Sequence, residues 1–243
     1  DGTIRLWKED SDKSLDTLQD AMKQVWTVAF SSDGRILASG STDHNPHGDD
    51  YHKIRLWNIG DGKCFDKLAV RSNQLRSIAF CPTNDQTTGL NLLISGGDDH
   101  TIKVWDINTK ECQKVIQGYT NRIWSVAFSP NGKILASGSE DNKIHFWQLQ
   151  DGKCITKSVK TLPGHTDWVW SVVFKPTFNQ DANILASASE DNTIRLWEQH
   201  KNNGQWKPKS PLKMHTDRVR IVAFSPDGTK LASAGNDCKI ILW

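Results

Sequence analysis

The sequence predicts an all-β fold assembled from one four-stranded unit that repeats along the chain, and three observations support this. An apolar segment ending in Trp recurs, at Trp7, Trp57, Trp105, Trp147, Trp197 and Trp243. A segment ending in Phe alternates with it, at Phe30, Phe80, Phe128, Phe174 and Phe224. No stretch shows the sustained periodicity of a helix. A chain of 243 residues can form one large domain of this kind.

The spacing of the two segments defines the length of the unit. The shortest distance from a Phe to the next Trp is 19 residues, and the shortest from a Trp to the next Phe is 23. The base unit is therefore 42 residues long, and longer spacings reflect insertions. A period in this range indicates a repeat architecture, in which neighbouring units bury one another's apolar faces.

Each unit contains four short apolar segments separated by turn signals. Residues 123–128 alternate and end at Ser-Pro-Asn-Gly, and residues 134–139 end at Glu-Asp-Asn. Residues 143–147 form the third segment, and a variable fourth segment such as 112–118 completes a unit. We treat residues 1–243 as a single region whose first strands begin near residues 25, 75, 123, 169 and 219.

The arrangement of these units follows from their hydrophobic pattern. The first two strands are apolar on both sides, which is typical of a sheet covered on both faces. Small sheets packed around a common axis satisfy that requirement and form a β-propeller. We expect four complete units with partial units at both ends, about five blades, as a fragment of a larger ring. Uncovered blade edges would favour self-association.

Residues 164–197, which run GHTDWVWSVVFKP and then ILASASEDNTIRLW after an insertion, closely resemble the Trp-Asp (WD) repeat family. The resemblance covers essentially the whole chain, although the Trp-Asp pair itself occurs only at Trp105–Asp106. It implies a non-catalytic scaffold for protein–protein interaction. The regular units are similar to bacterial multi-repeat WD proteins, in which the propeller often adjoins a signalling NTPase, kinase or protease domain as a sensor.

The family resemblance also implies a hydrogen-bonded set of His, Ser, Asp and Trp in each blade. Two repeats contain all four residues: His165, Ser187, Asp191 and Trp197, then His215, Ser233, Asp237 and Trp243. Such groups can satisfy one another when buried, as buried polar groups must. Other repeats have Tyr119, Arg71 and Ala21 at the His position, and we expect their blades to be less tightly held.

In this family the partner commonly binds the narrow face, and the resemblance implies three contributing positions per blade. The first position holds Trp26, Arg76, Trp124, Trp170 and Arg220; the second holds Gln24, Gln74, Arg122, Trp168 and Arg218; the third holds Thr42, Asp98, Glu140, Glu190 and Asn236. Trp and Arg are enriched at interface hot spots. We expect a polypeptide partner with a basic and an apolar anchor. The alternative is that the Trp side chains close the channel by packing on one another.

Two enzymatic interpretations are weaker. A Ser/His/Asp set suggests nucleophilic catalysis, but here it recurs at equivalent places in successive units, and no G-x-S-x-G motif accompanies it. The loop 43–52 contains weak candidate metal ligands: His44, His47, Asp49, Asp50 and His52. A propeller hydrolase with a metal near this loop is therefore an alternative, but we expect no enzyme and no cofactor.

Composition limits the remaining classes. The chain has 30 Lys and Arg against 28 Asp and Glu, so a nucleic-acid adaptor is only a second alternative. No apolar run exceeds four residues, so we expect no membrane segment. Five Cys without a Cys-x-x-Cys pair favour a reducing, cytoplasmic location. Cys64, Cys112 and Cys154 share one repeat position, where we expect a small buried apolar residue.

Overall fold

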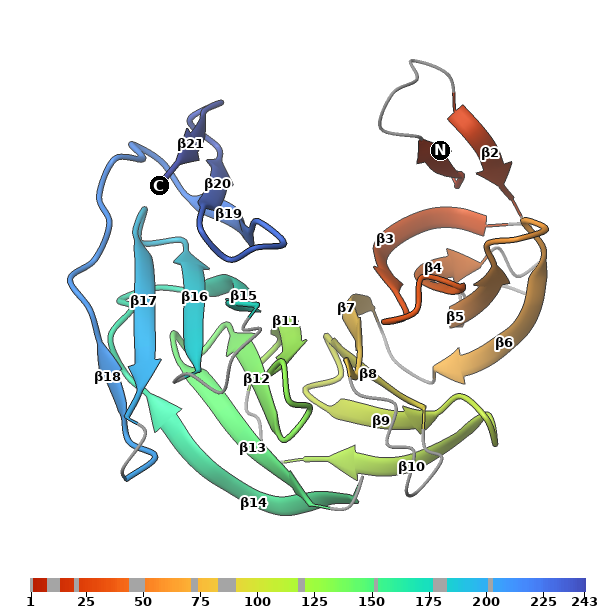
Figure 1. Cartoon of the computed structure of the whole chain (residues 1–243), viewed down its shortest axis with the longest axis horizontal. Coiled ribbons are helices and arrows are strands. Elements are labelled where there is room, and N and C mark those ends of the chain that lie inside the picture. The colour runs from red at the N-terminus through yellow and green to blue at the C-terminus, as the bar shows by residue number, and fades with distance from the viewer. Residues whose placement is uncertain are drawn as a thin grey trace.

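The protein is an all-β propeller. The computed structural model describes residues 2–7, 14–19, 22–43, 51–70, 74–82, 91–117, 121–150, 153–176, 183–200 and 203–243. Five small antiparallel sheets are arranged in a ring around a common axis (Figure 1). This architecture confirms the predicted fold class. Within the described residues, no helix is long and apolar enough to cross a membrane.

Each sheet is one blade, numbered here from 1 to 5 in chain order. Blade 1 comprises β3 (Met22–Phe30), β4 (Ile36–Asp43), β5 (Tyr51–Asn58) and β6 (Cys64–Val70). Blade 2 comprises β7 (Leu75–Phe80), β8 (Leu92–Gly97), β9 (Ile102–Asp106) and β10 (Glu111–Ile116). Blade 3 comprises β11 (Ile123–Phe128), β12 (Ile134–Ser139), β13 (Ile144–Gln150) and β14 (Lys153–Leu162). Blade 4 comprises β15 (Val169–Phe174), β16 (Ile184–Ser189), β17 (Ile194–Gln199) and β18 (Trp206–Pro208), and blade 5 comprises β19 (Val219–Phe224), β20 (Leu231–Gly235) and β21 (Ile240–Leu242).

A two-stranded ribbon, β1 (Ile4–Trp7) and β2 (Ser14–Leu18), precedes blade 1. Its Ile4 and Leu18 pack on Leu37 and Trp57 of blade 1. In blades 1 to 3, the equivalent positions of the third and fourth strands pack on the next blade. The ribbon therefore covers part of blade 1 in the same way.

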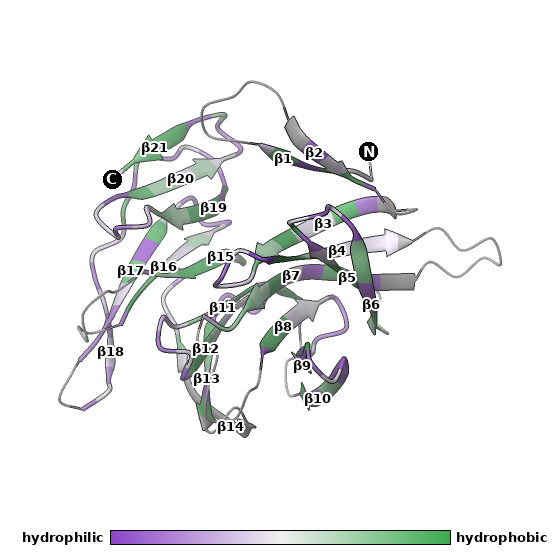
Figure 2. Cartoon of the chain, turned by 45° about the vertical axis from the view of Figure 1, so that its right-hand side comes forward, coloured by the Kyte–Doolittle hydropathy of each residue, from purple (hydrophilic) through white to green (hydrophobic). Residues whose placement is uncertain are grey.

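Apolar contacts between consecutive blades form the core. At the junction of blades 3 and 4, Ile144 and Phe146 pack against Val172 and Phe174 in one buried cluster. Figure 2 shows hydrophobic residues along the strands, whereas hydrophilic residues are concentrated in the connecting loops. A hydrogen bond from backbone to side chain also joins these two blades, since Val172 N–H donates to Ser125 Oγ of the preceding blade at 3.1 Å. Equivalent bonds join the first strands of blades 1 to 5 in succession.

Every blade has a β-bulge near the start of its first strand. The pairing register of β15 with β16 shifts between Val169 and Ser171, which leaves Trp170 outside the ladder. The same shift occurs in the other four blades. The unpaired residues are Trp26, Arg76, Trp124, Trp170 and Arg220. A bulge changes the direction of a side chain. These five residues, called the bulge residues below, therefore do not follow the alternation of side chains between the two faces of their strands.

The ribbon covers one face of blade 1 only in part, and the last face of blade 5 has no neighbouring blade among the described residues. Val28 and Phe30 of blade 1 are 49% and 54% exposed, although their equivalents in blade 4, Val172 and Phe174, are buried. Ile240 and Leu242 of blade 5 are 78% and 69% exposed. Blades 1 and 5 therefore do not pack together to close the ring, and their two faces lie across from each other in Figure 1.

Candidate functional site

A chain of buried hydrogen bonds links the four polar residues of blade 4. His165 Nδ1 lies 2.8 Å from Asp191 Oδ2, and His165 Nε2 lies 2.7 Å from Ser187 Oγ. Trp197 Nε1 donates to the same Ser187 oxygen at 2.9 Å. The groups satisfy one another, because one ring nitrogen of His165 meets the carboxylate while the other meets the Ser187 hydroxyl. Blade 5 repeats the arrangement with His215, Ser233, Asp237 and Trp243.

The chain of hydrogen bonds also sets the ionisation of its carboxylate. Burial raises the pKa of Asp191, but hydrogen bonds and the charge interaction with His165, together with hydrogen bonds from Thr193 and Thr166, outweigh burial and lower that pKa. In blade 5 the pKa of Asp237 is lowered in the same way, against the effect of burial, by Thr216 and His215. Both carboxylates are therefore held in their ionised form.

This arrangement has the connectivity of a Ser-His-Asp catalytic triad, yet it cannot act as one. Ser187 is completely buried, and its Oγ already accepts the indole N–H of Trp197. A nucleophile must reach the substrate, and Ser187 has no exposed surface in the described structure. The same geometry recurs in blade 5, where Ser233 is also buried, and such recurrence indicates a structural role in these two blades.

In blades 2 and 3 the equivalent turn carboxylate contacts a basic residue of the third strand, which the repeat pattern did not predict. Lys103 Nζ pairs with Asp99 in blade 2, and His145 Nε2 lies 2.8 Å from Asp141 in blade 3. In both pairs the basic residue lies four positions after the Asp, on the third strand of the same blade. That spacing is visible in the sequence. Arg71 and Tyr119, which occupy the His position in these repeats, lie outside the described residues, as does Ala21.

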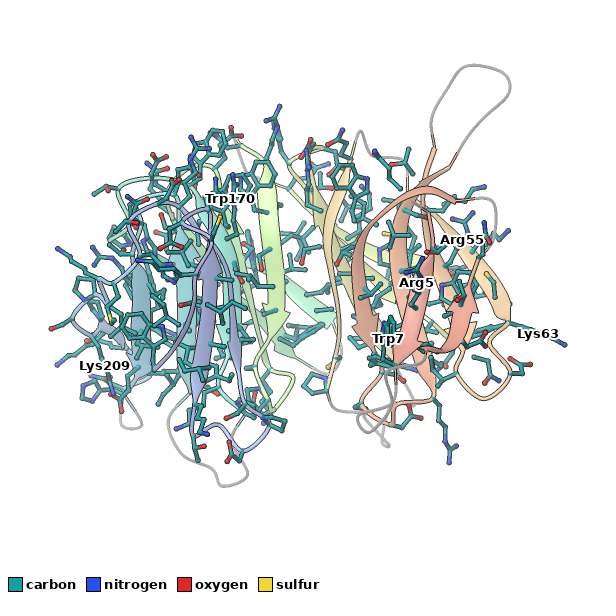
Figure 3. The ribbon with its side chains drawn as sticks, turned by 90° about the horizontal axis from the view of Figure 1, so that it is seen from above. Arg5, Trp7, Arg55, Lys63, Trp170 and Lys209 are labelled. Atoms are coloured by element: carbon teal, nitrogen blue, oxygen red, sulfur yellow. The ribbon has the colours of Figure 1, made fainter. Side chains whose placement is uncertain are left out.

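The five bulge residues lie next to one another around one edge of the ring. The guanidinium of Arg76 lies 5.3 Å from the ring centroid of Trp26 and 4.7 Å from that of Trp124. The rings of Trp124 and Trp170 are 4.2 Å apart, and Arg220 lies 4.0 Å over Trp170. Figure 3 shows Trp170 at this edge, whereas Trp7, Lys63 and Lys209 lie toward the opposite edge. These contacts agree with the alternative given above, in which the Trp side chains at these positions pack on their neighbours.

Most bulge residues also bond to the polar residue at the end of the second strand of their own blade. Arg76 forms two hydrogen bonds of 2.9 Å with Asp98, and Trp170 Nε1 donates to Glu190 at 2.6 Å. Trp26 donates to Thr42, and Arg220 donates to Asn236. Blade 3 departs from this pattern, because Trp124 Nε1 is buried without a hydrogen-bond partner among the described residues.

Two of the residues that lie two positions before a bulge are arginines with exposed side chains. Arg122 and Arg218 are 45% and 48% exposed at their side chains, while the carboxylates of Asp98, Glu140 and Glu190 are only 12–19% exposed. Arg218 Nε reaches across the blade junction to Glu190 at 2.7 Å. Trp168 stacks on Trp124 with ring centroids 5.8 Å apart and lies edge-on to Trp170. We call the bulge residues, these preceding residues and the acidic positions together the rim surface.

The rim surface thus contains every residue that the sequence predicted for partner binding: Trp26, Arg76, Trp124, Trp168, Trp170, Arg122, Arg218, Arg220, Asp98, Glu140 and Glu190. The structure connects them through ring contacts, hydrogen bonds and ion pairs. It also separates the mostly buried carboxylates from the exposed Trp26, Arg122 and Arg218, a difference that the repeat spacing alone does not reveal.

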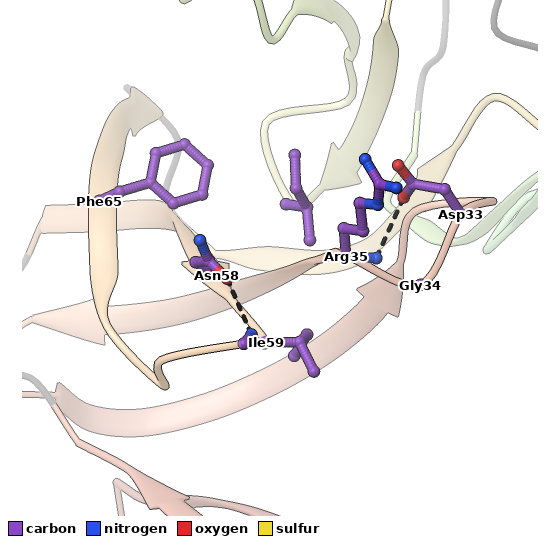
Figure 4. Close-up of a pocket in the computed structure, with 8 residues that line it drawn as sticks. Asp33, Gly34, Arg35, Asn58, Ile59 and Phe65 are labelled. Atoms are coloured by element: carbon purple, nitrogen blue, oxygen red, sulfur yellow. Dashed lines mark hydrogen bonds between the residues drawn. The ribbon is translucent and has the colours of Figure 1, made fainter.

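A hollow on blade 1 is the second surface feature, and the sequence analysis did not identify it. Its volume is about 650 Å³, and it is lined by the turn residues Asp33 to Ile36, by Asn58 to Gly60 and by Phe65 (Figure 4). The polar side chains there are used locally, since Asn58 Oδ1 accepts Gly60 N–H and Asp33 Oδ1 accepts Arg35 N–H. The hollow therefore has no convergent set of polar groups for chemistry.

The metal and cysteine predictions have different outcomes. His44, His47, Asp49 and Asp50 lie outside the described residues, and His52 is placed only as a strand position of β5. Within the described part of the chain, no three His, Cys, Asp or Glu side chains come together in a way that could hold a metal. The expectation of a buried Cys is wrong at Cys112, which is exposed because it lies on β10, the outermost strand of its blade. The Cys154 side chain is not among those described.

The fold and its repeated chains of hydrogen bonds define a β-propeller whose blades are built from Trp-ended repeats. The family described as "WD domain, G-beta repeat" matches residues 12–46, 62–106, 110–148, 156–198 and 206–243. The chain therefore belongs to the WD-repeat family.

Two named proteins are similar to parts of the chain. It is 26% identical over 177 residues to the Periodic tryptophan protein 2 homolog of Dictyostelium discoideum, which covers 72% of this chain and 18% of that protein. It is 25% identical over 96 residues to Eukaryotic translation initiation factor 3 subunit I of Debaryomyces hansenii, covering 40% of this chain and 25% of that protein. The chain thus spans a quarter or less of the length of these relatives.

Proposed function

We propose that the chain is a non-catalytic scaffold that binds a polypeptide partner through the rim surface. The observation that carries this proposal is the β-bulge, which presents a Trp or Arg from every blade at one edge of the ring. Trp and Arg supply large, rigid contacts at protein interfaces. Membership of the WD-repeat family supports a general role in protein interaction. One relative is named as a subunit of a translation initiation factor, which supports a role within a protein assembly. We also propose a cytoplasmic location.

Affinity capture with a rim variant tests this function. In the variant, Trp168→Ala is combined with Arg122→Ala and Arg218→Ala, whose side chains are 45% and 48% exposed. The control combines Lys63→Ala and Lys209→Ala at the opposite edge. Both proteins must retain the circular dichroism spectrum of the wild type. We expect the rim variant to lose proteins that the wild type and the control both retain. Equal capture by all three would refute the proposal.

A second binding mode is supported by exposed apolar residues on the outer faces of blades 1 and 5. We propose that Ile240 and Leu242 of one copy pack on Val28 and Phe30 of another, because equivalent residues meet at the junction of blades 3 and 4. Light scattering over a range of concentrations should show a dimer or larger species. Leu242→Glu should abolish it, whereas the same change at exposed Val115 on β10 should not. A monomer at every concentration would contradict this mode.

A further inference from the structure

The hydrogen-bond inventory of the rim surface indicates the charge of its partner, provided that the proposed function holds. The carboxylates already have donors. Asp98 accepts two hydrogen bonds from Arg76, whereas Glu190 accepts the indole N–H of Trp170 and forms an ion pair with Arg218. A ligand cation would therefore have to compete with donors that are already in place.

The donors of the rim surface are less fully used. The Arg122 guanidinium lies 3.8 Å from Asp98 and 3.9 Å from Glu140, beyond hydrogen-bond distance from either carboxylate. Arg218 forms an ion pair with Glu190 through Nε, and its terminal nitrogens have no hydrogen bond among the described residues. Arg220 also bonds through Nε, to the neutral Asn236. Guanidinium groups with unused N–H donors favour a ligand that carries carboxylates.

We propose that the rim surface binds an acidic peptide segment, whose carboxylates accept hydrogen bonds from Arg122 and Arg218 while an apolar side chain contacts Trp168. A continuous phosphate chain fits less well, because Asp98, Glu140 and Glu190 lie among the arginines and the whole chain has a net charge of only +2. This proposal replaces the basic anchor expected from the sequence, since the structure pairs the carboxylates internally.

Two further carboxylates of the same turns limit where the ligand can lie. Asp167 and Asp217 accept the backbone N–H groups of Trp168 and Arg218 at 2.8 Å and 2.7 Å. Asp217 is exposed and adjacent to Arg218 in the chain, so it repels an acidic ligand. Removing the Asp217 carboxylate should therefore strengthen the binding of an acidic ligand, whereas it would weaken the binding of a basic ligand.

Fluorescence anisotropy with three labelled peptides of equal length tests the proposal. One is rich in Glu with a single Leu, and in the others Gln or Lys replaces Glu. We expect roughly tenfold tighter binding of the Glu peptide than of the Gln peptide, weakening as salt is added. Arg122→Gln with Arg218→Gln should remove that preference, and Asp217→Asn should increase the affinity for the Glu peptide. Lys209→Gln is the matched control, because Lys209 is 49% exposed and pairs with Glu198.

Several results would overturn the acidic-peptide proposal. These are equal binding of the Gln peptide, tighter binding of the Lys peptide, or preservation of the Glu preference in the double arginine variant. Tighter binding of a single-stranded oligonucleotide, lost in the same variant, would instead assign a phosphate chain. If rim variants still lose captured proteins while the Glu peptide does not bind, only the acidic-peptide proposal fails. If capture never depends on the rim surface, the proposed function fails as well.

Discussion

Blades 3 and 4 share their strand order and their bulge, but they bind the turn carboxylate differently. In blade 4, Asp191 contacts His165, which lies 26 residues earlier, on the segment that crosses from β14 to β15. In blade 3, Asp141 contacts His145, only four residues later on β13. Both contacts satisfy the carboxylate, but only the first one fixes the crossing between two blades. Two blades with similar backbones can therefore differ in how firmly they are attached to their neighbours.

The largest expected difference comes from removing His165. The His165→Ala change leaves Ser187 and the ionised Asp191 without their buried partner, so we expect a loss of about 3 kcal/mol in the free energy of unfolding. Chemical denaturation followed by circular dichroism measures this loss. An unchanged midpoint would show that the chain of hydrogen bonds does not stabilise blade 4.

The second prediction concerns the charge on Asp191. Because the folded-state pKa of Asp191 lies below its ordinary value of 3.8, its contribution is complete above that pH and is lost as the pH falls below it. Asp191→Asn should therefore cost about 2 kcal/mol at neutral pH, and the difference from the wild type should shrink in acid. Urea midpoints measured across the acid range check this sign. A difference that grows as the pH falls would contradict it.

A smaller effect is expected at the corresponding contact of blade 3. Burial raises the pKa of Asp141, but its hydrogen bond and charge interaction with His145 outweigh burial and lower that pKa. Since this contact lies within one blade and is partly exposed, His145→Ala should cost about 1 kcal/mol. The measurement is the same denaturation experiment. A cost equal to that of His165→Ala would remove the distinction between the two blades.

The smallest predicted effects come from the bulge tryptophans. Trp170→Phe removes the N–H that bonds to Glu190 and should cost about 1 kcal/mol. Trp124→Phe removes an N–H that has no partner in the described structure and should leave the free energy of unfolding nearly unchanged. Each variant is the control for the other, because both retain an aromatic ring. The reverse order of the two costs would show that Trp124 Nε1 has a partner.

The repeat pattern was sufficient to predict the propeller and the positions around its rim, because the positions of Trp and Phe set the length of every unit. The pattern could not show how those side chains divide their contacts. Whether Arg122 bonds to a carboxylate or remains 3.8 Å away depends on the relative placement of neighbouring blades. The replacement of His by His145 was missed because the family resemblance placed the basic group before the first strand. Cys112 was misjudged because the pattern does not show that the outermost strand leaves one side exposed.

Capture of partner proteins by folded His165→Ala protein, measured beside the rim variant at one temperature, tests most directly whether the buried contacts and the rim surface have separate roles. We predict that His165→Ala unfolds at lower denaturant concentration yet retains the wild-type partners, while the rim variant keeps its stability and loses them. Loss of partners in the folded His165→Ala protein, with retention in the rim variant, would contradict this separation.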